Sequence, residues 1–309
     1  MTPSWFDHAP VLVSETVEIL SAVPRGIVVD ATLGGAGHAT ALLDAAPHLR
    51  VVGVDQDPEA RRAAQERLTP YGDRAVVLAG RFDRLNDLLD RAGIADISGF
   101  LFDLGVSSPQ LDIPERGFSF RHDGPLDMRM DPDAALTADT IVNQWSEPKL
   151  SSIIRSGGDE RFAGRIAKAI VAARPIRGTV QLAEVVVAAI PAATRRTGGH
   201  PAKRTFQALR IAVNDELTIL EPALRAALGR LIPNGRGVVL TYHSGEDRIV
   251  KGVFRELTTS TTPVHLPVPE EAAPFRLLRP ASRTASSDEQ ERNPRSRSAR
   301  LRAIERVAA

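Results

Sequence analysis

The sequence predicts an α/β protein with a doubly wound parallel sheet. Three observations support this fold class. Short apolar runs alternate with helix-like stretches over the first third of the chain. A glycine-rich turn joins the first run to the first helix, and three of the runs end in an acid, at Asp30, Asp55 and Asp103. Because ligands bind beyond the carboxyl ends of parallel strands, these acids are expected to share one crevice.

The elements of the first third follow from local patterns. Asp57 is the expected N-cap of a helix with Pro58 at its first position. Strands are expected over 26–30, 50–55, 75–78 and 97–104, and helices over 38–46, 58–68 and 85–92.

The pattern changes after the fourth strand. Residues 105–132 are irregular, and a loop this long is usually functional or disordered. Its embedded Phe118, Phe120, Met128 and Met130 favour an ordered lid. Residues 137–201 have a helical pattern with no strand signal, which indicates an inserted all-helical domain.

The sheet is expected to resume after this insertion. One or two amphipathic helices over 205–232 precede an apolar strand over 238–243, and 298–307 is a candidate final strand. The expected organisation is therefore a discontinuous domain, residues 1–114 and 205–309, interrupted by a lid and helical substrate-recognition domain over 115–204.

Composition excludes several classes of protein. The formal net charge is only +1, from 39 basic and 38 acidic residues, which excludes a globally cationic nucleic-acid coat. The absence of cysteine excludes disulfides, thiolate metal sites and cysteine nucleophiles, and it favours a cytoplasmic compartment. We find no signal peptide, no apolar run of membrane-spanning length and no metal site.

The glycine-rich turn predicts a nucleoside cofactor. Gly35, Ala36, Gly37 and His38 follow the first strand, and Asp55 lies where a carboxylate can accept both ribose hydroxyls of an adenosine. Thr40 replaces the third glycine of a dinucleotide-binding turn, which disfavours a nicotinamide cofactor. An acid just before the turn, Asp30, suits a cationic amino-acid end, and this favours S-adenosylmethionine.

The end of the fourth strand is the expected place for substrate chemistry. There the polar and proline residues Ser107, Ser108 and Pro109 follow Asp103. In amino-methyltransferases a segment of this type holds an exocyclic amine by hydrogen bonds. Acceptors that draw the amine hydrogens out of the ring plane restore the nucleophilicity of the nitrogen toward a methyl sulfonium held in line.

Seven segments resemble a known family. The chain is similar nearly end to end to the bacterial ribosomal RNA small subunit methyltransferase H family, which methylates N4 of a decoding-centre cytosine in 16S rRNA. The segments that carry the resemblance are 103–112, 115–120, 123–132, 158–163, 200–211, 242–251 and 293–299.

The resemblance implies a class I methyltransferase fold and S-adenosylmethionine as the cofactor. The implied cofactor contacts are Ala36, Gly37, His38, Asp55, Phe82, Asp103 and Gln110. His243 is a further candidate, either to orient the cytosine or to accept a proton, with a structural hydrogen-bonding role as the alternative. The chain departs from the family pattern at two positions, where Ala36 replaces a glycine and Gly245 a leucine.

The implied partner is 16S rRNA in the small ribosomal subunit, bound by a monomer or homodimer. Residues 185–214 contain no acid, and their cations are candidate RNA contacts: Arg195, Arg196, Lys203, Arg204 and Arg210. Phe118, Phe120 and Trp145 are available for base stacking, or alternatively fill the core of the insertion. The competing functions are a DNA or other RNA amino-methyltransferase, a nicotinamide dehydrogenase and a non-catalytic ribosome-assembly factor.

Overall fold

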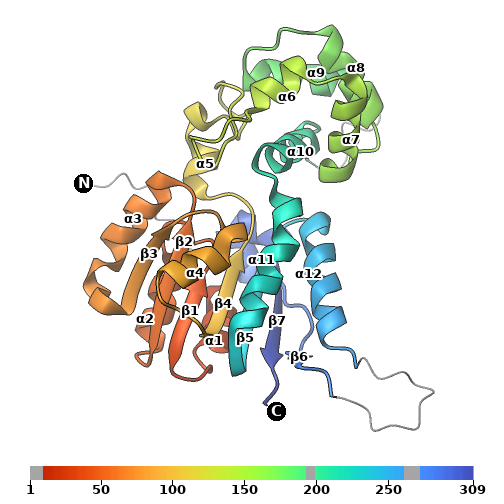
Figure 1. Ribbon diagram of the computed structural model, residues 1–309. Helices are drawn as coiled ribbons and strands as arrows, with labels where there is room; N and C mark the ends of the chain where they lie inside the picture. The colour runs from red at the N-terminus through yellow and green to blue at the C-terminus, as the bar shows by residue number, and fades with distance from the viewer. Residues whose placement is uncertain (1–9, 193–198, 261–271, 309) are drawn as a thin grey trace, which may run out of the picture. The chain divides into compact units, whose positions relative to one another are not determined.

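The computed structural model describes residues 10–192, 199–260 and 272–308 (Figure 1). Two compact units make up the chain, one formed by residues 1–105 and 217–309 and the other by residues 106–216. The sequence predicted an inserted domain over 115–204, which lies within the second unit. Its exact boundaries stay a prediction. No helix among the described residues is long and apolar enough to cross a membrane.

The first unit is built on a seven-stranded sheet in the order β3-β2-β1-β4-β5-β7-β6. Its strands β1 to β5 are parallel, and β7 is antiparallel to both β5 and β6. This topology confirms the expected doubly wound α/β sheet. The strands span Gly26–Asp30 (β1), Leu49–Asp55 (β2), Ala75–Ala79 (β3), Ile97–Asp103 (β4), Leu231–Thr241 (β5), Phe275–Leu277 (β6) and Arg300–Arg306 (β7).

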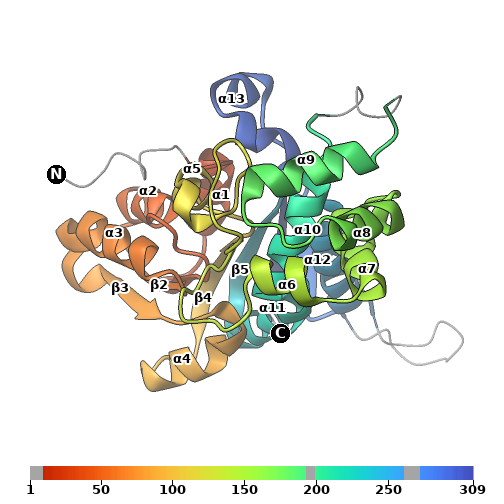
Figure 2. The same cartoon turned by 90° about the horizontal axis from the view of Figure 1, so that it is seen from above.

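Alternate residues of the strands enter two different cores. Val28 and Val51 pack with one set of helices, whereas Val29 and Val52 pack with another. This is the two-residue period of a strand that is buried on both faces. The first set is α1 (Val13–Leu20), α2 (Gly37–Ala45) and α3 (Pro58–Leu68), and the second is α4 (Leu85–Arg91), α11 (Glu216–Arg230) and α12 (Ser244–Leu257) (Figure 2). A short helix, α13 (Ser287–Arg292), precedes β7.

The second unit is helical. Its core includes Phe118, Met128 and Met130 from the segment expected to form a lid, so this segment is ordered within its own unit. Phe118 therefore fills the core, which was one of the two roles expected for it. The helices are α5 (Ser108–Asp112), α6 (Ala138–Gln144), α7 (Glu147–Gly158), α8 (Ala163–Ala172), α9 (Thr179–Ala189) and α10 (Lys203–Asn214).

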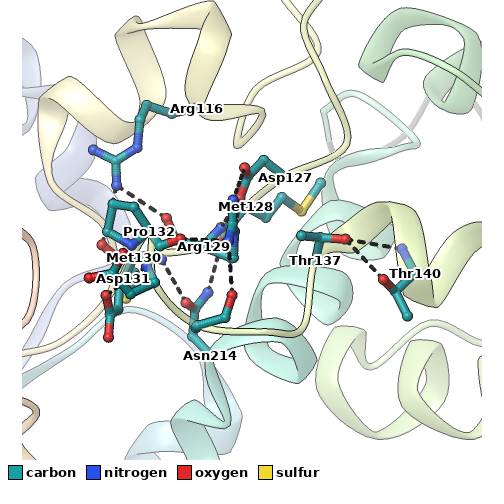
Figure 3. A network of polar contacts seen from close by, with 12 residues as sticks. Arg116, Asp127, Met128, Arg129, Met130, Asp131, Pro132, Thr137, Thr140 and Asn214 are labelled. Carbon is teal, nitrogen blue, oxygen red and sulfur yellow. Dashed lines mark hydrogen bonds and ion pairs between the residues drawn. The ribbon is translucent and has the colours of Figure 1, made fainter.

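A buried amide holds the segment 127–132 in place (Figure 3). Asn214, at the end of α10, donates to the carbonyl of Met128 and accepts from the backbone N–H of Met130, both at 2.8 Å. Arg116 donates to the carbonyls of Arg129 and Met130. Met128 has a left-handed backbone (φ 62°), so this network fixes a strained residue.

The close packing of α7 on α10 gives a stability prediction. A Cβ on Gly158 would lie 2.5 Å from the carbonyl oxygen of Arg204, whereas one on Gly164 of α8 would lie 3.8 Å from Ser151 Oγ. We expect Gly158→Ala to lower the free energy of unfolding by about 1–3 kcal/mol through overpacking. The matched Gly164→Ala change should raise it by no more than about 1 kcal/mol. Urea denaturation measures both, and equal effects would contradict the packing described.

Candidate functional site

The turn between β1 and α2 has a left-handed backbone at Gly34 (φ 51°) and at Ala36 (φ 61°). Glycine adopts this conformation freely, whereas a residue with a Cβ loses about 1–2 kcal/mol. The Ala36 methyl group is fully buried in the core of the first unit, which offsets part of that strain. The departure from the family's glycine is therefore tolerated at a strained position directly before α2.

Three side chains converge on the carboxylate of Asp103 or its backbone. Tyr242 donates its hydroxyl to Asp103 Oδ1 at 2.6 Å, and the backbone N–H of Asp103 donates to Thr32 Oγ1 at 2.6 Å. His38 Nε2 lies 3.4 Å from Asp103 Oδ2. These contacts join the end of β4 to the turn after β1, to the start of α2 and to the residue after β5.

His38 and the neighbouring Asp30 are buried, and burial changes the titration of this site. Asp30 is 3% exposed, and desolvation raises the pKa of its carboxyl to about 7, although His38 opposes the shift. Burial works against a charged His38, but the neighbouring Asp103 and Asp30 outweigh it and raise the pKa of the imidazole. Burial, together with Asp103, raises the pKa of Tyr242 well above its usual value, so this phenol stays a hydrogen-bond donor.

His38 is a buried side chain with an unused polar atom. Its Nε2 faces the Asp103 carboxylate at 3.4 Å, but within the described part of the chain its Nδ1 has no hydrogen-bond partner. Buried polar groups are nearly always hydrogen-bonded, so such a nitrogen indicates a place where a ligand supplies the partner.

Asp55 ties the end of β2 to the glycine-rich turn. Its Oδ2 accepts from the backbone N–H of Gly34 and its Oδ1 from that of Asp57, both at 2.8 Å. Desolvation by burial raises the pKa of this carboxyl to about 6, although the two N–H donors lower it. Each oxygen keeps a further lone-pair site, so each can accept one more hydrogen bond.

Phe82 begins a short 3-10 helix after β3 and is half-buried. Its ring packs edge-on against Phe102 of β4, with ring centroids 5.6 Å apart. The ring is therefore held in one orientation by the core, and its contact with an adenine stays a prediction.

Comparison with known proteins assigns the family. The sequence model of the MraW methylase family matches residues 5–307. The chain belongs to the MraW methylase family. A relative called Ribosomal RNA small subunit methyltransferase H, from Mycobacterium sp. (strain KMS), is 52% identical over 98% of this chain and 84% of its own length. Proteins of the same name from Thermobifida fusca (strain YX) and Symbiobacterium thermophilum are 53% and 51% identical, over 97% and 98% of this chain and 93% and 98% of their own lengths.

Four of the catalytic and cofactor-binding residues predicted for this methylase lie in the second unit. Ser107 caps α5, and Gln110 accepts from the Ser107 backbone N–H at 3.1 Å in a capping box. Pro109 and Gln110 are buried, and Ser108 is half-buried. Asp103 belongs to the first unit, and the expected meeting of these residues with it stays a prediction.

His243 caps α12. Its Nδ1 accepts from the backbone N–H groups of Gly245 (3.1 Å) and Glu246 (3.4 Å). An accepting Nδ1 places the proton of a neutral ring on Nε2, which lies 3.1 Å from Glu246 Oε1. His243 therefore has the structural hydrogen-bonding role that was the alternative to a catalytic one. Because Nδ1 already accepts two hydrogen bonds, it has no lone pair left to take a proton from the substrate.

The predicted RNA contacts have different surroundings. Arg195 and Arg196 lie outside the described residues. Lys203 and Arg204 are exposed at the start of α10, and Arg204 donates to the carbonyl of Asp159. Arg210 forms a two-pronged ion pair with Glu216, with both contacts at 2.8 Å. Their RNA-binding roles stay predictions.

Sequence reasoning missed Tyr242 and Thr32, the two hydroxyls that hold Asp103. A signal was present for both. Thr32 is two residues beyond β1, and Tyr242 directly follows β5. The rule that parallel strands place their carboxyl ends at one edge of the sheet therefore applied to these hydroxyls as well as to the acids.

Proposed function

We propose that this methylase transfers a methyl group from S-adenosylmethionine to the exocyclic N4 amine of a decoding-centre cytosine in 16S rRNA of the small ribosomal subunit. The observation that supports this cofactor is the set of carboxylates at the ends of β1, β2 and β4, around a glycine-rich turn. The relatives' name supports the ribosomal substrate.

The first unit fits this cofactor on its own chemistry. Asp55 would accept the two ribose hydroxyls, and Asp30 would face the cationic amino-acid end. The unpartnered Nδ1 of His38, whose Nε2 faces Asp103, offers a hydrogen-bond site. When bound, the cofactor supplies a methyl group activated by a sulfonium.

The protein's part in the transfer is to position the reactants. The N4 lone pair of cytosine is delocalised into the ring, so the amine must be oriented by acceptors before it attacks. Asp103, Ser107, Ser108 and Pro109 are the proposed residues for this task. The proton lost from the amine can pass to water, so the reaction needs no strong base, in keeping with the capping role of His243.

Methyl transfer to small ribosomal subunits tests the proposal. Radiolabelled S-adenosylmethionine is incubated with subunits from a strain that lacks the modification, and the product nucleosides are separated. We expect labelled N4-methylcytidine, lost in Asp103→Asn and kept in Asp87→Asn, whose carboxylate is exposed on α4. Labelling of DNA or of another RNA would favour the alternative amino-methyltransferases. Subunit binding without transfer would favour an assembly factor.

A further inference from the structure

The second unit carries three aromatic rings in a graded series from core to surface. Phe206 of α10 is 4% exposed, Phe120 is half-buried and His200 is exposed. The rings of Phe120 and Phe206 meet edge to face with centroids 4.9 Å apart. The His200 ring lies flat on Phe120, with centroids 4.4 Å apart and planes 29° apart. One face of the imidazole therefore covers Phe120, while the residue as a whole is exposed.

The outer ring is held rigidly. His200 Nδ1 accepts from the backbone N–H of Ala202 at 3.2 Å, which fixes the rotation of the imidazole. Its carbonyl accepts from the N–H of Lys203, so the first turn of α10 begins directly beneath it. A ring fixed in advance loses little conformational entropy when a ligand stacks on it.

Basic residues lie close in the chain to His200 and to Phe120. Lys203 and Arg204 are exposed in the first turn of α10, and Arg121 is exposed next to Phe120. The nearest acid in sequence to Phe120, Asp123, is engaged, because its carboxylate accepts from the backbone N–H of Val180 at the start of α9. An exposed, stacked ring with exposed cations close to it in the chain suits a ligand that has both a π-face and phosphates.

We propose that the outer face of His200 is a stacking platform for an unpaired base of the substrate RNA, with Lys203 and Arg204 contacting the adjacent phosphates. This inference rests on the proposed function for the identity of the RNA. In RNA-binding proteins, unpaired bases stack on aromatic rings, including histidine, and nearby cationic side chains contact the phosphates of the RNA backbone. Phe120 acts as a positioning residue, because it supports the ring from below.

RNA binding measured without methyl transfer tests the platform. The probes are small ribosomal subunits and a fluorescein-labelled single-stranded RNA of about twelve nucleotides, long enough for one binding site. We expect His200→Ala to raise the dissociation constant about tenfold, and His200→Phe to stay within about twofold of the parent protein. Lys203→Ala should weaken binding several-fold, whereas Lys168→Ala, which removes an exposed cation from α8, should not.

Two results would overturn the platform: unchanged binding by His200→Ala, or binding by His200→Phe as weak as that of His200→Ala. Thermal denaturation and S-adenosylmethionine binding should be unchanged in both variants, which separates a lost stacking partner from a lost fold. If no rRNA is methylated but the binding pattern holds, the proposed reaction fails and the platform stands. If the rRNA is methylated normally but His200→Ala binds RNA as the parent protein does, the proposed reaction stands and the platform fails.

Discussion

Asp30→Asn should stabilise the free protein at pH 8 and weaken its binding of S-adenosylmethionine. In the folded protein, burial raises the pKa of this carboxyl from 3.8 to about 7, so folding disfavours its charged form. The cost is absent below the unfolded pKa, grows between about pH 4 and pH 7, and is complete above pH 7. Because a tenfold change in an equilibrium constant corresponds to about 1.4 kcal/mol, this rise in pKa limits the cost to about 4 kcal/mol.

Asparagine removes this cost because it is neutral and still accepts from the backbone N–H of Thr32. We expect a gain of about 1–3 kcal/mol in the free energy of unfolding at pH 8 and almost none at pH 4. The affinity for the cationic cofactor should fall at least tenfold, since a buried charge loses its partner. Wild-type affinity should likewise fall as the pH is lowered through 7.

Urea denaturation at pH 4 and pH 8 and calorimetric titration with S-adenosylmethionine measure the two effects. Asp87→Asn, which neutralises an exposed carboxylate, should change neither quantity appreciably. A stability gain of the same size at both pH values would show that burial of the Asp30 charge is not its cause.

Features that depend on short stretches of sequence were predicted well. The strands that end at Asp30, Asp55 and Asp103 were correctly expected, because an apolar run followed by an acid is visible locally. The cap formed by Asp57 before Pro58 was also correct. Helix α12 was not expected, since its N-cap is His243, a residue outside the usual capping set.

Contacts between distant residues could not be predicted in this way. The hydroxyl of Tyr242 reaches Asp103 across 139 positions, and the amide of Asn214 reaches Met128 across 86. The cationic patch was predicted from charge alone, and charge does not reveal that Arg210 is paired with Glu216. The left-handed backbone of Met128 is likewise imposed by its partners, because methionine has no local preference for it.

Asn214→Leu should destabilise the second unit more than Gly158→Ala does. It removes the two hydrogen bonds to Met128 and Met130 and a third, at 2.9 Å, to the carbonyl of Arg210. A leucine of similar volume would leave the Met128 carbonyl and the Met130 N–H buried without partners, at about 1–3 kcal/mol each. We therefore expect a loss of about 3–5 kcal/mol in the free energy of unfolding.

Asn143→Leu is the matched control, because Asn143 bridges the N–H and carbonyl of Ile176 in the same way but is only half-buried. Water can replace the amide there, so its cost should be about 1 kcal/mol. Calorimetric binding of S-adenosylmethionine should survive Asn214→Leu, since Asp30, Asp55 and Asp103 belong to the first unit. Transfer to small subunits should fall, because release of the strained Met128 lets the segment 127–132 leave the conformation in which Asn214 holds it. If Asn214→Leu and Asn143→Leu proved equally stable, the buried amide would not be what holds that segment.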